Sequence, residues 1–124
     1  MKATHCLLLW VALGMALCLP ACGRKAKTAD ASQPLQQSFQ SAEPPVQQAI
    51  ATVTTSLKAG NYTEATRALT PVVTSRQLTG EQRKAVGVAL QQINQAVAAN
   101  PKLNTKEMYE MRRKLFAAGF GNSD

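Results

Sequence analysis

The fold is decided by the stretch PPVQQAIATVTTSLKAGNYTEA at residues 44–65. Its two leading prolines suit the first turn of a helix, where backbone N–H groups have no intrahelical partner. Apolar residues then recur at helical spacing and predict one buried stripe, made of Val46, Ala49, Ile50, Val53 and Leu57. Gly60 predicts a left-handed helix stop, and Asn61 with Glu64 predicts a capping box that starts a second helix. So short a break predicts an antiparallel αα-hairpin.

The same periodicity continues toward the C-terminus and predicts three more helices after the first. Their inner faces are predicted to be Tyr62, Ala65, Leu69, Val72 and Val73 in the second helix, Val86, Ala89, Leu90, Ile93, Ala96 and Val97 in the third, and Met108, Met111, Leu115 and Ala118 in the fourth. No segment alternates apolar and polar residues as a strand does. Residues 44–124 are therefore predicted to form a small all-α, four-helix domain built from αα-hairpins.

Turn and capping residues predict where these helices begin and end. Pro71 predicts a kink or an early end of the second helix, because proline lacks the N–H that would bond the carbonyl of Arg67. The other predicted boundaries are a Thr79–Gln82 capping box, a stop at Asn100-Pro101, a cap at Asn104 or Thr105, and an end at Gly119 with Phe120 folding back on the last turn. The core is rich in Ala and Val, and its aromatic candidates are Tyr62, Tyr109, Phe116 and Phe120.

An apolar run from Cys6 to Leu19 precedes the helical domain. With Lys2 before it, the run has the charged start and apolar centre of a signal peptide, and it is short for a membrane span of about 20 residues. An uncleaved anchor is the alternative. The run closes in Leu19-Pro20-Ala21-Cys22, which resembles the lipobox of bacterial lipoproteins, although Pro20 stands where that family usually has a small residue.

The lipobox resemblance implies that residues 1–21 are a cleaved signal peptide and that Cys22 carries acyl chains such as palmitate. The protein would then be lipid-anchored to a cell membrane in the cell envelope. Gly23 stands where aspartate would indicate inner-membrane retention, so the resemblance favours the outer membrane, facing the periplasm. The alternative for Cys22 is a plain thiol in a secreted protein.

Cleavage would leave a chain with few specialised chemical groups. Removing Lys2 lowers the formal net charge from +7 to +6, and His5, Trp10, Cys6 and Cys18 are also lost. Disulfides, zinc sites and Cys–His catalysis then lack their residues. We therefore predict no cofactor, no metal and no enzymatic activity, and export makes nucleic acid an unexpected partner.

Residues 22–43 are predicted to be a flexible tether. Their composition is dominated by Ala, Ser, Gln, Lys and Pro, and Leu35 and Phe39 are the only sizeable apolar residues. Two apolar residues are too few to offset the entropy lost on ordering such a stretch. The alternative is that Pro34–Phe39, which is similar to Pro45–Ile50, forms a short extra helical turn packed on the domain.

A second resemblance concerns the hairpin. Gly60-Asn61-Tyr62-Thr63-Glu64-Ala65 is similar to the turn between the two helices of a tetratricopeptide repeat. It covers about one repeat, residues 46–78, and departs from the family at Val53 and Pro71. The resemblance implies binding of a peptide or protein in a groove between helices.

Three sets of polar residues are candidate sites. Glu107 and Glu110 lie one helical turn apart, and a carboxylate pair can hydrolyse glycosides, although an ion-paired surface is favoured by the neighbouring cations. Arg112, Arg113 and Lys114 could form a basic surface with Arg83 and Lys84, or serve solubility. The glutamines Gln82, Gln91, Gln92 and Gln95 could pair with a partner helix or form a neutral polar surface.

The leading hypothesis is a non-catalytic binding, scaffold or pilotin-like accessory lipoprotein whose partner is another envelope protein. Two alternatives stay open. One is an enzyme or inhibitor that acts on the cell wall, and the other is a purely structural envelope lipoprotein.

Overall fold

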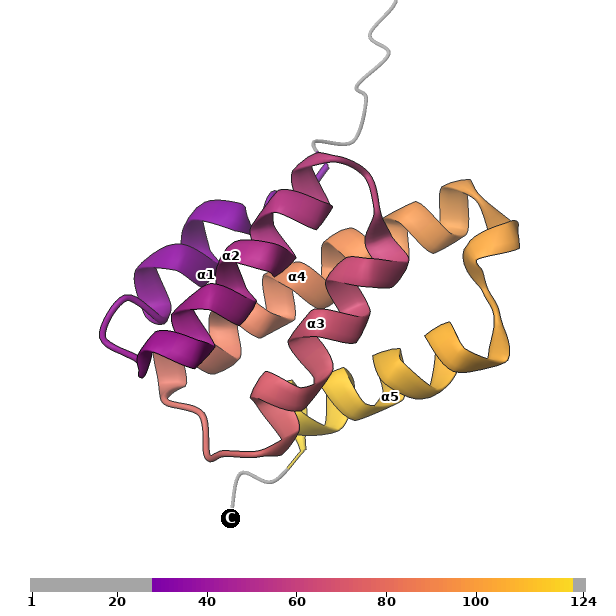
Figure 1. Ribbon diagram of the computed structural model, residues 1–124. Helices are drawn as coiled ribbons and strands as arrows, with labels where there is room; N and C mark the ends of the chain where they lie inside the picture. Colours follow the sequence, from indigo (N-terminus) through magenta and orange to yellow (C-terminus); the bar gives the residue numbers. More distant parts are fainter. Residues whose placement is uncertain (1–27, 122–124) are drawn as a thin grey trace, which may run out of the picture.

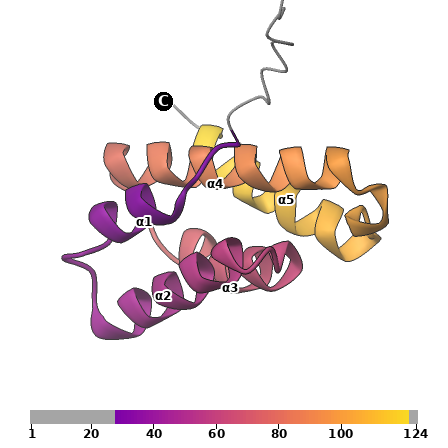
Figure 2. The ribbon, with the colours of Figure 1, turned by 90° about the horizontal axis from the view of Figure 1, so that it is seen from above.

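The computed structural model describes residues 28–121, and their fold is all-α, which confirms the predicted class. This part of the chain contains α1 (Ser32–Ser38), α2 (Pro44–Lys58), α3 (Tyr62–Thr74), α4 (Gly80–Ala99), the 3₁₀ helix η1 (Pro101–Leu103) and α5 (Lys106–Phe120). Neighbouring helices pack in a closed ring, α1 on α2, α2 on α3, α3 on α5, α5 on α4 and α4 on α1 (Figures 1 and 2). The four α-helices predicted for residues 44–124 are α2 to α5, and α1 adds a helix from the segment that was predicted to be a tether.

The predicted hairpin is formed by α2 and α3. Two prolines occupy the first turn of α2, and Gly60 follows its end with a φ of +74°. The N–H groups of Gly60 and Asn61 donate to the carbonyls of Leu57 and Ser56, at 3.2 and 2.8 Å, which is the bond pair of a Schellman motif. Asn61 then caps α3 by accepting the Glu64 N–H at 3.3 Å. The reciprocal bond of a capping box is replaced by an ion pair between Glu64 and Arg67.

Pro71 lies inside α3, which runs on to Thr74. The helix therefore does not end early, and that alternative was wrong. Val72 and Val73 are buried, so packing stabilises the turn that proline weakens. Three threonine hydroxyls also donate to carbonyls four residues earlier, at 2.6 to 2.9 Å; they belong to Thr66, Thr70 and Thr74.

Capping residues delimit α4 and α5 largely as predicted. Both bonds of the Thr79–Gln82 capping box form, at 3.2 and 3.0 Å. Asn100 ends α4, and Thr105 rather than Asn104 caps α5. The predicted stop at Gly119 was wrong, because α5 continues to Phe120 with Gly121 as its C-cap. Gly119 instead lies beside α4, where an added Cβ would stand 3.7 Å from a methyl group of Val86.

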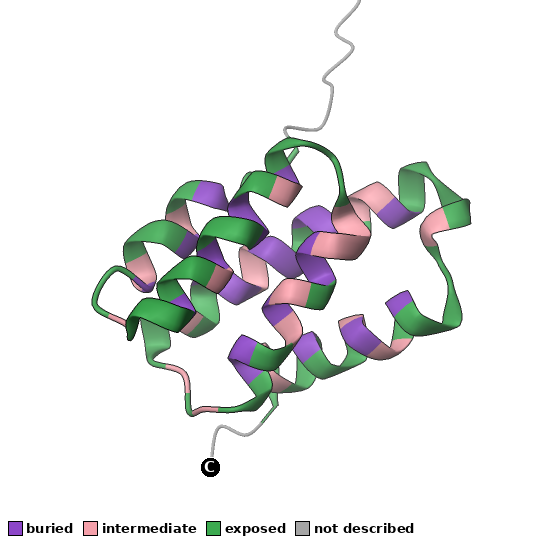
Figure 3. Ribbon diagram, in the orientation of Figure 1, coloured by how far each residue is buried: buried purple, intermediate pink, exposed green. Residues whose placement is uncertain are grey.

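Figure 3 marks the buried residues of the helices in purple, and nearly all residues of the predicted inner faces belong to the core. Only Ala49, Tyr62, Ala96 and Ala118 among them are half-buried rather than buried.

The flexible tether was a wrong prediction for the part of residues 22–43 that the structure describes. Leu35 and Phe39 are buried, with 0% and 1% of their surface exposed, and Ala31 is buried beside them. These side chains anchor α1 in the ring, so the ordering entropy is offset by burial of a large aromatic ring and two aliphatic groups. The alternative of an extra helical turn at Pro34–Phe39 is the one confirmed.

Candidate binding surface

Helix α4 packs against both α1 and α5. On the α1 side its glutamines hold the start of the domain. The backbone N–H of Ala31 donates to Oε1 of Gln92 at 2.9 Å, and that of Ala29 donates to Oε1 of Gln95 at 3.1 Å. Nε2 of Gln82 donates to the carbonyl of Ser38 at 3.3 Å. Three of the four glutamines therefore bind residues 29–38 of the same chain, and Gln91 is exposed.

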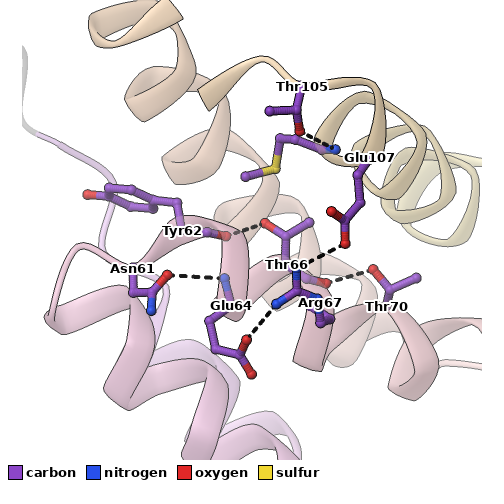
Figure 4. Close-up of polar contacts among 9 residues, drawn as sticks. Asn61, Tyr62, Glu64, Thr66, Arg67, Thr70, Thr105 and Glu107 are labelled. Atoms are coloured by element: carbon purple, nitrogen blue, oxygen red, sulfur yellow. Dashed lines mark hydrogen bonds and ion pairs between the residues drawn. The ribbon is translucent and has the colours of Figure 1, made fainter. Parts of the chain in front are cut away.

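The two carboxylates that suggested glycoside hydrolysis are each engaged by a cation. Glu107 accepts a 3.0 Å hydrogen bond from Arg67, which also binds Glu64 at 2.9 Å and so links α3 to α5 (Figure 4). The hydrogen bond that Arg67 donates to Glu107, followed by the one that it donates to Glu64, raises the pKa of Arg67 above its usual value. Glu110 pairs with Arg113 at 3.0 Å. In residues 28–121, no group of three or more His, Cys, Asp or Glu side chains is placed to hold a metal ion.

The five cations of the candidate basic surface do not gather on one face. Arg83 lies in the first turn of α4 beside Gly119, whereas Arg112 donates to Asn94. Arg83 and Asn94 are separated by about 16 Å along the helix axis. Lys84 pairs with Glu81 at 3.0 Å. Arg113 and Lys114 are both exposed on α5, one turn or less from Arg112.

Arg112 is fixed differently from the other cations. Its two terminal nitrogens donate to Oδ1 of Asn94 at 2.8 Å and Oδ1 of Asn104 at 2.7 Å. Both partners are neutral amides, so the guanidinium is oriented without being neutralised. Its Nε atom is buried and has no partner within the described residues.

Three aromatic side chains of α5 that were candidates for the core are exposed. Tyr109, Phe116 and Phe120 have 55%, 58% and 59% of their surface exposed. Phe116 and Phe120 stack on each other with ring centroids 5.2 Å apart. Core positions on α5 are taken by Met108, Met111 and Leu115 instead.

A shallow, mostly apolar groove runs between α4 and α5 beneath these rings. Its larger part encloses about 430 Å³ and is lined by Gly87, Leu90, Gln91, Asn94, Gln95, Ala98, Phe116 and Phe120. A smaller part of about 230 Å³ continues it and is lined by Leu90, Asn94, Tyr109, Arg112, Arg113 and Phe116. We call this surface the aromatic groove.

Gly87 shapes the aromatic groove at its Phe120 end. A Cβ built on Gly87 would lie 3.0 Å from Cζ of Phe120, so the ring rests where any larger residue would push it outward. Sequence reasoning missed this surface, yet a signal was present. Tyr109, Phe116 and Phe120 are seven and eleven residues apart, which puts them on one helical face, separate from the methionine–leucine face.

The predicted lipidation site lies outside the described residues, as do Leu19, Pro20 and Ala21 of the lipobox. Within residues 28–121, every helix is too short or too polar to cross a membrane. No protein family, curated protein or solved structure matches this chain.

Proposed function

We propose that this chain is a lipid-anchored envelope protein that acts by binding another envelope protein, as a scaffold or pilotin-like accessory factor. The single observation that carries the binding function is the aromatic groove. Exposed contiguous apolar surface is unusual on a monomer and marks interaction sites. Tyr109 and two arginines belong to the residue types that dominate the binding energy of protein interfaces, and phenylalanine is enriched there.

The location rests on the lipobox resemblance at Leu19–Cys22 and on the apolar run before it. Two or more acyl chains on Cys22 would hold the domain at the membrane, because each buried methylene contributes about 0.8 kcal/mol. Outer-membrane attachment facing the periplasm is proposed from Gly23.

A non-catalytic role agrees with the ion pairs that the two candidate acidic residues form. Glu107 and Glu110 are committed to separate ion pairs on an exposed surface. A glycosidase needs two carboxyl groups that face the scissile bond together, whereas these two are bound separately by Arg67 and Arg113.

Anchoring is tested by comparing the full chain with a Cys22→Ala variant. We expect wild-type protein to fractionate with membranes and its mature N-terminal peptide to carry acyl chains in mass spectrometry. The variant should leave the membrane fraction. An intact Met1 or an unmodified Cys22 thiol in the wild type would refute the anchor.

Binding is tested by placing a photo-crosslinking amino acid at Phe116 in cells that make the protein. The matched control carries it at Thr52, an exposed residue of α2 outside the aromatic groove. We expect a discrete crosslinked protein from position 116 and none from position 52. Equal crosslinking from both positions, or none from either, would refute a binding function for the groove.

A further inference from the structure

We infer that the aromatic groove receives a short amphipathic helix whose apolar residues are flanked by aspartate or glutamate. This inference rests on the proposed binding function and adds the conformation and charge of the partner segment.

The conformation follows from the shape of the groove. It runs between two antiparallel helices, and Tyr109 and Phe120 are about 16 Å apart along α5, which matches about three turns of a docked helix. Apolar anchors at i, i+4 and i+7 span such a groove. An added strand would need a free sheet edge, and residues 28–121 contain no sheet.

The chain itself already contains this mode of packing on the other side of α4. Helix α1 lies against both α2 and α4 and inserts Leu35 and Phe39 between them. The aromatic groove offers the same arrangement, two neighbouring helices and a space between them, without an occupant among the described residues.

The charge of the partner follows from the residues around the groove. No carboxylate lines either part of it, whereas Arg112 and Arg113 line the smaller part. Arg112 is held by two neutral amides, so its hydrogen-bond partners do not offset its positive charge. Arg113 is ion-paired with Glu110, so we expect Arg112 to contribute more to the attraction of an acidic partner. A partner with carboxylates at this end would gain ion pairs, and one with lysines would be repelled.

The test is a selection of random 16-residue peptides displayed on phage against the immobilised full chain, with a Phe116→Ala/Phe120→Ala variant for counter-selection. We expect enriched peptides to carry leucine or aromatic residues at helical spacing together with Asp or Glu. Synthetic copies should bind the wild type at least tenfold more tightly than the variant. Binding should weaken as salt concentration rises.

Two charge variants separate the electrostatic part from the apolar part. Arg113→Gln should weaken the selected peptides at least threefold and reduce their salt dependence. Lys58→Gln removes the same charge from α2, outside the aromatic groove, and should leave binding unchanged. Circular dichroism of each variant checks that the helices remain.

Several outcomes would overturn the inference. They are failure to enrich any peptide, enrichment of basic or proline-rich peptides, and a concentration-dependent dimer in sedimentation that Phe116→Ala/Phe120→Ala abolishes. Binding of the groove to anionic phosphatidylglycerol vesicles in place of peptides would also overturn it. Crosslinking at Phe116 combined with selected peptides that show no preference for Asp or Glu would refute this inference alone. Absence of crosslinking would refute the proposed function.

Discussion

The two sides of α4 differ in what covers them. On one side α1 fills the space, Phe39 is 1% exposed, and three glutamines of α4 bind backbone groups of residues 29–38. On the other side Phe116 is 58% exposed over the aromatic groove, and Gln91 lines it as an exposed residue. Phenylalanine and glutamine side chains therefore stabilise the fold where a helix covers them, and they stay exposed where no described residue does.

The largest test of this difference removes one phenyl ring from each side. Phe39→Ala should lower the free energy of unfolding by about 3–5 kcal/mol, because it leaves a cavity in the core. Phe116→Ala should lower it by about 1 kcal/mol or less, since it removes one exposed aromatic contact. Urea denaturation followed by circular dichroism measures both. Equal losses would mean that the two sides are energetically alike.

A smaller test compares two adjacent glutamines of α4. Gln92→Ala should cost about 1–3 kcal/mol, because the buried N–H of Ala31 loses its acceptor. Gln91→Ala changes an exposed residue of the aromatic groove and should stay within about 0.5 kcal/mol of the wild type. Thermal melts at matched protein concentration give the two values, and a neutral Gln92→Ala would show that the hydrogen bond does not hold α1 in place.

A third change affects stability and binding in opposite directions. Gly87→Ala should raise the free energy of unfolding by about 0.5–1 kcal/mol, because alanine favours the helix and its methyl meets only the movable ring of Phe120. The displaced ring of Phe120 should at the same time weaken the binding of the selected peptides severalfold. Gly80→Ala, whose methyl would meet open space at the start of α4, is the control that leaves peptide binding unchanged. If Gly87→Ala bound the peptides with wild-type affinity, peptide binding at the Phe120 end of the groove would be contradicted.

The smallest expected effect is a pH dependence confined to the α1 side. The Ser32 N–H donates to Asp30 at 2.9 Å and holds the pKa of that carboxyl below its usual value. The folded state therefore favours the ionised form, so the contribution is full at neutral pH and is lost as the pH falls below about 4. Asp30→Ala should be less stable than the wild type at pH 6, and the gap should shrink toward pH 3. If the difference in stability between Asp30→Ala and the wild type were the same at pH 6 and pH 3, this role of Asp30 would be contradicted.

Sequence reasoning predicted the parts of the fold that depend on neighbours along the chain. The stripes of α2 to α5, the Schellman stop at Gly60 and the capping box at Thr79 all follow from residues within a few positions of one another. Hydrophobic spacing also assigned Met108, Met111 and Leu115 correctly to the core.

The wrong predictions concern residues whose burial depends on helices that are distant in the sequence. Leu35 and Phe39 are too few to order a helix by themselves, and they are buried because α2 and α4 supply the remaining surface. Tyr109, Phe116 and Phe120 are apolar enough for a core, but α5 offers only one face to α3 and α4. Periodicity shows that the three aromatic residues share one face of α5. Which face of α5 is covered depends on the packing of α3 and α4, so the groove itself follows from the tertiary arrangement.

Gln82 has a consequence for the cooperativity of the domain. Its amide oxygen accepts the Thr79 N–H at the start of α4, while its amide nitrogen donates to Ser38 at the end of α1, 44 residues away in sequence. Detaching α1 therefore loosens the first turn of α4, and fraying of that turn loosens α1. Hydrogen exchange at these two helix ends should report a single opening event rather than two independent ones.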